Sequence, residues 1–278
     1  MPPAIRIGPL VFPAELAVLA VAAALALLAA RVLDRRPRAE RRADVSGVLW
    51  GALIAGLAAA RLGFVWEYRD QFAQHPLGIL DVRDGGWSGT LGLAAAWLYG
   101  VTAMLRRTVP RPALLGALAL ASAAWLVGGR LLAPAGEPAP ALAELQLQAL
   151  DGTPAALSAF HGKPAVINLW ASWCPPCRRE MPAFARAQAA HPDVHFVFLN
   201  QGETAPEIAR YLQEHAPGLR NVLRDPAGAA SLDLSNRGLP ATLFLDAEGR
   251  LVDLRVGELS AATLAQRLVT LRAAASAP

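Results

Sequence analysis

The only two cysteines of the chain lie within one short stretch, NLWASWCPPCRREMP, at positions 174 and 177. A CxxC spacing serves either a zinc site or a redox-active disulfide. A four-ligand zinc site would need further cysteines or a histidine cluster, and the sequence offers neither, so we predict a redox pair and no metal. The histidines are scattered, at His75, His161, His191, His195 and His215.

The residues around the pair predict how it reacts. The apolar run AVINLW predicts a buried strand, and a helix is predicted from about Cys174 to Ala190. A thiol at a helix N-terminus has a lowered pKa, because the helix dipole and free N–H groups stabilise its thiolate. We therefore predict that Cys174 attacks and that Cys177, one turn later, resolves the mixed disulfide.

Both residues between the cysteines are proline. Pro175 suits a first helical position, where its missing N–H is not needed. Together Pro175 and Pro176 remove two N–H donors near the Cys174 sulfur, so its thiolate should be less stabilised than in CxxC proteins with full backbone donation. A less stabilised reduced form has a more negative potential, which predicts a reductant.

The remainder of residues 141–278 alternates predicted strands and helices. A strand in VHFVFLN is followed by an amphipathic helix in TAPEIARYLQEHA, and a hairpin in ATLFLDAEGRLVDLRV precedes a last helix capped by Ser260. A strand is also predicted in LRNVLRD, with a short helix near 227–232. This order predicts an α/β domain with a mixed sheet and helices on both faces.

The first part of the chain has a different composition, rich in Ala, Leu, Val and Gly. Its third apolar segment is the shortest and needs Ser88 to Thr90, or an interfacial end, to cross a membrane. We predict a membrane domain at 1–132, an Ala/Pro linker at 133–140 and the α/β domain at 141–278. The four predicted transmembrane helices are Val11–Ala30, Val48–Val65, Leu91–Leu105 and Ala113–Leu132.

The distribution of charge predicts the orientation of these spans. Residues 1–140 carry 14 Arg against 9 acidic residues, whereas residues 141–278 carry 12 basic and 13 acidic residues. Arginines cluster after the first and third segments, so the positive-inside rule places those loops in the cytoplasm. Both termini and the CxxC domain are then periplasmic, at a bacterial inner membrane. The sequence contains no basic patch with interleaved aromatic residues, so it gives no indication of nucleic-acid binding.

Residues 59–93, AARLGFVWEYRDQFAQHPLGILDVRDGGWSGTLGL, resemble the bacterial prolipoprotein diacylglyceryl transferases, as does the opening IRIGPLVFPAE. That family has a catalytic His where this chain has Thr90, and its later signature survives at most in GGRLLAPAGE, around Arg130. A general base must reach the proton it removes, and Thr90 does not titrate near neutral pH. The departures imply that lipid transfer is lost and that this half is an anchor in the lipid bilayer.

The stretches INLWASWCPPCRREMP and RGLPATLFLDAEGRLV resemble the TlpA-like, membrane-anchored branch of the thioredoxin fold over about residues 141–273. The resemblance assigns Cys174 as nucleophile, Cys177 as resolving thiol and Pro240 as a cis-proline packed against the disulfide. A cis bond there would expose the backbone of Leu239 to a substrate strand.

The same resemblance gives roles to three residues near the pair. Trp173 would cover the sulfurs, and Glu180 occupies the acidic position of this branch. Asn168 stands where ordinary thioredoxins keep a buried Asp, which implies that proton handling has moved to Glu180. The sequence leaves open a second interpretation of Glu180, as a solvated residue in the first turn of its helix.

The predicted function is a membrane-anchored thiol–disulfide oxidoreductase that reduces disulfides in exported proteins, with no cofactor beyond the Cys174–Cys177 pair. The alternatives are a dithiol oxidant or isomerase, a thioredoxin of the cytochrome c maturation type, a lipid-transfer enzyme with a redox accessory domain, and a chaperone-like module that holds strands at Leu239–Pro240. Because the spans contain no Cys and no flavin or haem pattern, a separate membrane protein must donate the electrons.

Overall fold

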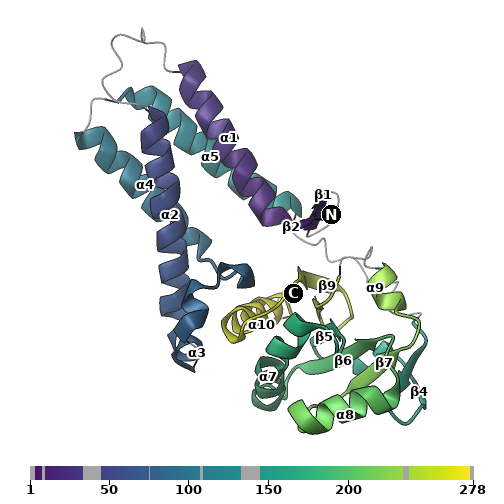
Figure 1. Ribbon diagram of the computed structural model, residues 1–278. Helices are drawn as coiled ribbons and strands as arrows, with labels where there is room; N and C mark the ends of the chain where they lie inside the picture. The colour runs from purple at the N-terminus through teal and green to yellow at the C-terminus, as the bar shows by residue number, and fades with distance from the viewer. Residues whose placement is uncertain are drawn as a thin grey trace. The chain divides into compact units, whose positions relative to one another are not determined.

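A computed structural model of the chain describes residues 4–7, 10–33, 45–74, 76–106, 109–132, 145–233 and 238–275 (Figure 1). The chain divides into two compact units, essentially Ala4–Leu132 and Ala133–Pro278. The predicted Ala/Pro linker at 133–140 lies outside the described residues.

The N-terminal unit is helical, and all four predicted apolar segments form helices. The predicted start of the first helix is wrong: a short antiparallel hairpin precedes it, so that helix begins only at Ala14. The elements are β1 (Ala4–Ile7), β2 (Leu10–Pro13), α1 (Ala14–Leu33), α2 (Val45–Glu67), α3 (Arg69–Gln74), η2 (Pro76–Leu80), η3 (Val82–Asp84), α4 (Gly89–Arg106) and α5 (Arg111–Leu132).

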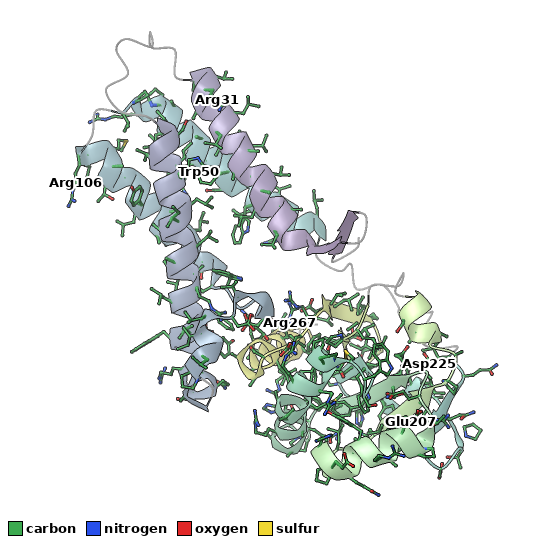
Figure 2. All side chains as sticks on the ribbon, in the orientation of Figure 1. Arg31, Trp50, Arg106, Glu207, Asp225 and Arg267 are labelled. Atoms are coloured by element: carbon green, nitrogen blue, oxygen red, sulfur yellow. A yellow bond between two sulfur atoms is a disulfide. The ribbon has the colours of Figure 1, made fainter. Side chains whose placement is uncertain are left out.

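These helices pack in pairs, α1 against α5 and α2 against α4. Gly56 and Gly92 allow the second pair to approach closely, since a Cβ on Gly92 would lie 3.0 Å from the Gly56 carbonyl oxygen. Arg31 and Arg106, in the last turns of α1 and α4, lie at the same end of the unit (Figure 2). The helix ends from which the two arginine-rich stretches continue therefore lie at one end of the unit, as the positive-inside argument requires.

Within the described residues, three helices are long and apolar enough to cross a membrane: α1, α2 and α5. The prediction of a helical membrane region followed by an α/β domain is confirmed. The fourth crossing is not, because α4, a helix of 18 residues, does not reach the hydropathy of the other three. A crossing at α4 stays a prediction.

The C-terminal unit contains a mixed sheet with the strand order β4-β3-β7-β6-β5-β8-β9. The three strands β5, β6 and β7 are parallel, and β3, β8 and β9 run antiparallel to their neighbours. The strands are β3 (Leu147–Ala149), β4 (Pro154–Ala155), β5 (Ala165–Trp170), β6 (His195–Gln201), β7 (Val222–Asp225), β8 (Ala241–Leu245) and β9 (Leu251–Val256). The α/β prediction holds, although β3 and β4, the two strands at one side of the sheet, were not predicted, because they are too short to show a period.

The helices of this unit cover the sheet unequally. They are η4 (Leu157–Phe160), α7 (Pro175–Ala190), α8 (Ala205–His215), α9 (Ala229–Asp233) and α10 (Ala261–Ala275). The longer helices α7, α8 and α10 contribute to the hydrophobic cluster on one face, and η4 and α9 contribute to the cluster on the other. Both faces are therefore covered, as predicted.

The central strand β5 is buried along its whole length, as expected for a strand covered on both faces. Val166 and Trp170 belong to the cluster with α7, whereas Ile167 and Leu169 belong to the opposite cluster. Because side chains alternate along a strand, Asn168 points into the layer between β5 and α7. A polar side chain at that depth requires hydrogen-bond partners.

Candidate active site

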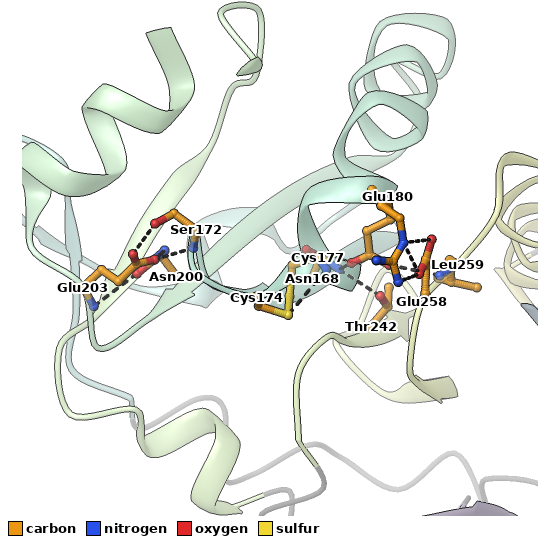
Figure 3. Close-up of a disulfide and its surroundings, with 11 residues drawn as sticks. Asn168, Ser172, Cys174, Cys177, Glu180, Asn200, Glu203, Thr242, Glu258 and Leu259 are labelled. Atoms are coloured by element: carbon orange, nitrogen blue, oxygen red, sulfur yellow. Dashed lines mark hydrogen bonds and ion pairs between the residues drawn. A yellow bond between two sulfur atoms is a disulfide. The ribbon is translucent and has the colours of Figure 1, made fainter. Parts of the chain in front are cut away.

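The two cysteines form a disulfide where α7 begins, four residues after the end of β5 (Figure 3). Cys174 is the N-cap of α7, and its sulfur accepts a hydrogen bond from the backbone N–H of Cys177 at 3.4 Å. Cys174 is 3% exposed and Cys177 is fully buried, so a partner reaches the Cys174 sulfur first. Pro175 and Pro176 open the helix without N–H groups, which leaves the Cys177 amide as a donor to that sulfur.

The Leu239–Pro240 peptide bond is cis and lies immediately before β8. Leu239 packs against the hydrophobic cluster that contains both cysteines. The Pro240 carbonyl accepts a hydrogen bond from the N–H of Gly257 at 2.8 Å, which ties the segment to the end of β9. The structure thus brings Pro240 and the CxxC pair to one region, from positions more than sixty residues apart in the sequence.

Glu180 is buried, with 1% of its surface exposed, so the interpretation as a solvated first-turn residue is wrong. Its Oε1 accepts a hydrogen bond from Asn168 Nδ2 at 2.8 Å, and its Oε2 accepts one from the backbone N–H of Leu259 at 3.0 Å. Asn168 Nδ2 also donates to Thr242 Oγ1 at 3.1 Å. The carboxyl therefore joins α7 to β5, to β8 through Asn168, and to the segment before α10 (Figure 3).

Burial governs the protonation of this carboxyl. It raises the pKa of Glu180 from the usual 4.5 to about 8, although the hydrogen bonds from Leu259 and Asn168 act in the opposite direction. At neutral pH the neutral acid therefore predominates. A buried group that changes protonation near neutral pH, one turn beyond a reactive cysteine, is chemically suited to exchange protons.

An ion pair lies beside this network and was not predicted. Arg179 Nε donates to both carboxylate oxygens of Glu258, at 3.1 and 2.9 Å, and Nη2 donates to Oε2 at 2.5 Å. Glu258 immediately precedes Leu259, whose N–H binds Glu180. The pair thus joins the N-terminal part of α7 to the segment that supplies this N–H. Arg179 is exposed, but its guanidinium group is held by Glu258.

A second carboxylate at the site, Glu203, was also not predicted from the sequence. Its Oε2 accepts hydrogen bonds from the N–H of Ser172 and from Asn200 Nδ2, both at 2.6 Å, and its Oε1 accepts one from Ser172 Oγ (Figure 3). Ser172 lies two residues before Cys174. The sequence did contain a signal for Glu203. The polar stretch NQGET lies at the carboxyl end of one predicted strand, and the CxxC turn lies at the carboxyl end of another. The carboxyl ends of neighbouring parallel strands lie at the same edge of a sheet.

Removing the Glu203 carboxylate is expected to destabilise the C-terminal unit. Glu203→Ala leaves three donors without their acceptor. A hydrogen bond to a charged group contributes about 1.5–3 kcal/mol, and because water can reach these part-buried donors, the unfolding free energy should fall by the value of one such bond, about 2 kcal/mol. Urea unfolding monitored by tryptophan fluorescence measures this loss. Glu248→Ala, in the exposed hairpin turn, is the control and should change stability little. Equal effects of the two variants would contradict the role of Glu203.

The two tryptophans near the pair have different environments. Trp170 is fully buried beside Tyr211, with ring centroids 5.3 Å apart, and belongs to the core. Trp173, next to Cys174, is 67% exposed and offers a large apolar surface to a partner. Its covering of the sulfurs stays a prediction. Within the described ranges, no group of three or more His, Cys, Asp or Glu side chains is placed to hold a metal ion.

The fold and the site together define a class of protein. A mixed sheet with helices on both faces, a CxxC disulfide between its central strand and a helix, and a cis-proline in the adjoining region are the features of thioredoxin-fold proteins with a redox dithiol.

Comparison with known proteins agrees with this class. The Redoxin family matches residues 134–268. Over 149 residues the chain is 33% identical to the thiol:disulfide interchange protein DsbE of Pseudomonas fluorescens, covering 51% of this chain and 81% of that protein. Over 136 residues it is 30% identical to the thioredoxin-like protein YneN of Bacillus subtilis, covering 48% and 78%. Through its C-terminal half, the chain belongs to the thioredoxin-like family of thiol:disulfide interchange proteins.

The comparisons give three further matches. The chain is 35% identical to DsbE of Allochromatium vinosum over 107 residues, which are 38% of this chain and 59% of that relative. The solved structure of MTB dsbF, in mixed oxidised and reduced forms, shares 28% identity and a TM-score of 0.43, covering 48% of this chain and 98% of that one. Residues 4–132 match the family described as prolipoprotein diacylglyceryl transferase.

Proposed function

We propose that the chain is a thiol–disulfide oxidoreductase that reduces disulfides in other proteins. The observation that carries the proposal is the disulfide at the start of α7, with Cys174 at the surface side and Cys177 buried behind it. The membership in the thiol:disulfide interchange family supports the same activity.

The exchange takes place in two displacements. The Cys174 thiolate attacks one sulfur of a substrate disulfide, forms a mixed disulfide and releases the first substrate thiolate. The Cys177 thiolate then attacks Cys174, closes the disulfide of the pair and releases the second substrate thiolate. Two electrons pass to the substrate, and a donor dithiol must reduce the pair before the next turnover.

Glu180 takes part as a proton carrier in this proposal. Cys177 must lose a proton before it attacks, and it is fully buried, away from bulk water. Glu180 follows Cys177 by three residues on α7, so both side chains lie on one face of the helix. In its ionised form the carboxyl accepts the Cys177 proton, and burial then favours the neutral acid that results.

The proposed location is a bacterial inner membrane, with several crossings and with both termini and the redox unit in the periplasm. The three apolar helices and the arginines at one end of the helical unit support it. In that compartment the substrates are exported proteins with disulfides, and the electron donor is a separate membrane protein. The runner-up activity is that of a dithiol oxidant. Lipid transfer is not proposed, because Thr90 stands in place of a general base.

The direction of exchange can be tested through the two prolines. We expect the reduction potential of the pair to lie well below about −120 mV, the value of a strong oxidant. Pro176→Ala restores an N–H donor near the Cys174 sulfur, which stabilises the thiolate, so the potential should become less negative and the pKa of the Cys174 thiol should fall. Equilibration with glutathione buffers measures the reduction potential of the parent protein and of Pro176→Ala. A parent potential near that of strong oxidants would favour the oxidant.

A further inference from the structure

The loop between α2 and α4 folds back along α2 instead of extending away from it. The N–H of Ser88 donates to the Ala60 carbonyl oxygen at 2.9 Å, and the Gly86 backbone lies directly on the Phe64 ring. Ala60 precedes the end of α2 at Glu67 by seven residues, which is about 10 Å along the helix axis. We call residues 76–88 the folded-back segment.

Arg61 binds the folded-back segment through its entire guanidinium group. Nε donates to the Ile79 carbonyl oxygen at 3.1 Å, and Nη2 donates to those of Gly78 and Asp81, both at 2.8 Å. Nη1 donates to the Gly86 carbonyl oxygen at 2.9 Å and to Asp84 Oδ1 at 3.0 Å. Arg61 and Asp84 are both buried, so the charges neutralise each other inside the unit. The guanidinium group is therefore held inside the unit and does not extend to the solvent.

The outer surface of the same segment is apolar. Leu77 is 84% exposed, Leu80 is 81% exposed and Val82 is also exposed. The carbonyl groups on the inner side bind Arg61, whereas these large side chains point away from the protein. This distribution is the reverse of that expected for a loop in water, which would expose its polar groups.

The depth of Arg61 in α2 indicates what these side chains contact. α2 has 23 residues, enough to cross the hydrocarbon core of about 30 Å, and Arg61 lies five residues, or about 8 Å, from its middle. Irregular backbone is tolerated at such a depth only where its polar groups are satisfied by protein. Arg61 satisfies four carbonyl groups of the segment, which removes the main obstacle to placing it there.

The folded-back segment also lies beside the part of α2 that α4 does not reach. α4 begins at Gly89, and Gly92 packs against Gly56 and Ala60, so the first turn of α4 lies beside the interior of α2 and not beside its end. The remaining length of α2 is accompanied by the folded-back segment, which leads directly into α4.

We propose that the folded-back segment enters the lipid bilayer and completes the crossing begun by α4, with Leu77, Leu80 and Val82 in contact with lipid acyl chains. The third crossing of the membrane then consists of an 18-residue helix and an irregular segment held by Arg61. This gives an even number of crossings, which returns the redox unit to the side of the N-terminus. The proposal goes beyond the redox activity and rests only on the proposed membrane location.

Site-specific labelling in vesicles tests this proposal. A Cys174→Ser/Cys177→Ser background leaves one thiol per variant, and Leu80→Cys, Ile54→Cys and Val269→Cys each receive an environment-sensitive fluorophore. Ile54 lies exposed on α2 and Val269 lies exposed on α10 of the other unit. The full chain is reconstituted into phosphatidylcholine vesicles that contain spin-labelled lipids, and quenching is compared with that by aqueous iodide.

We expect the Leu80 label to be quenched by spin-labelled lipid to an extent comparable with Ile54, with blue-shifted emission, and the Val269 label to be quenched only by iodide. A Leu80 label quenched like Val269 would place the segment in water and overturn the proposal. A label quenched by neither reagent would show that protein covers it, which also overturns the proposal. Failure of lipid quenching at Ile54 would instead reject the membrane location itself.

The role of Arg61 is tested separately with Arg61→Lys. A lysine ammonium has three donors without the planar fork of arginine and cannot bind the same four carbonyl groups. The Leu80 label should then lose lipid quenching and gain iodide quenching, while the Ile54 label stays unchanged. An unchanged Leu80 signal would overturn the assignment of Arg61 as the group that holds the segment in the bilayer.

Discussion

Replacing Cys174 by Ser is expected to abolish disulfide reduction by the purified chain. A serine hydroxyl cannot form a disulfide, and the buried Cys177 cannot reach a protein disulfide in its place. The measurement is the reduction of insulin disulfides with dithiothreitol as donor, followed by turbidity, in which the variant should not exceed the rate with dithiothreitol alone. Undiminished activity would contradict the assigned nucleophile.

Cys177→Ala is the matched variant, because it keeps the nucleophile and removes only the second displacement. We expect it to accumulate a mixed disulfide through Cys174, visible as a mass increase that reductant reverses. In cells the same variant should trap both an exported substrate and the membrane electron donor. Trapping of the donor alone would favour a relay role, and continued function of Cys174→Ser in cells would favour a chaperone-like module without turnover.

Much of the redox unit could be predicted from the sequence because its signals are local. The apolar run of β5, the CxxC at a helix start and the hairpin of β8 and β9 are each formed by one short continuous stretch of sequence, and the structure has all three. The helix predicted near 227–232 appears as α9, shifted by about two residues. Such patterns depend on periodicity and turn chemistry, which neighbouring residues alone determine.

The environment of Glu180 could not be predicted in the same way. CRRE at the start of a helix is compatible with a solvated charge, and the groups that bury it come from distant parts of the chain. Leu259 is 79 residues away, and Asn168 is joined to Thr242 across 74 residues. Only the antiparallel pairing of β5 with β8 brings Thr242 opposite Asn168. Long-range pairing of this kind leaves no periodic signal in the sequence.

Arg61 shows the same limit in the helical unit. A single arginine near the end of an apolar helix suggests contact with water or phosphate, and the sequence cannot show that the following loop folds back to bind it. The carbonyl groups that bind Arg61 belong to Gly78, Ile79, Asp81 and Gly86. Backbone carbonyls exist at every position, so residue types do not reveal them as partners.

Glu180→Gln is expected to remove a pH dependence from the stability of the oxidised protein. In the folded state the pKa of Glu180 is about 8, whereas the unfolded chain ionises near 4.5. Between these pH values the unfolded state is stabilised relative to the folded state, because it releases a proton that the folded state retains. The stability that this group contributes is therefore fully present below about pH 4.5. Between about pH 4.5 and pH 8 it declines by about 1.4 kcal/mol per pH unit, and above about pH 8 it no longer changes.

Glutamine carries no ionisable proton, so the variant should lose this slope. From pH 5 to pH 8 the free energy of unfolding of the variant should therefore increase relative to that of the parent. Because the amide offers only one acceptor to Asn168 and Leu259, its stability at pH 5 should be lower than that of the parent. Urea unfolding of the oxidised forms at several pH values separates the two effects. Glu214→Gln, on the exposed side of α8, should keep the parental slope. A slope that persists in Glu180→Gln would show that this carboxyl is ionised in the folded state, and the proton transfer proposed for Cys177 would then need another acceptor.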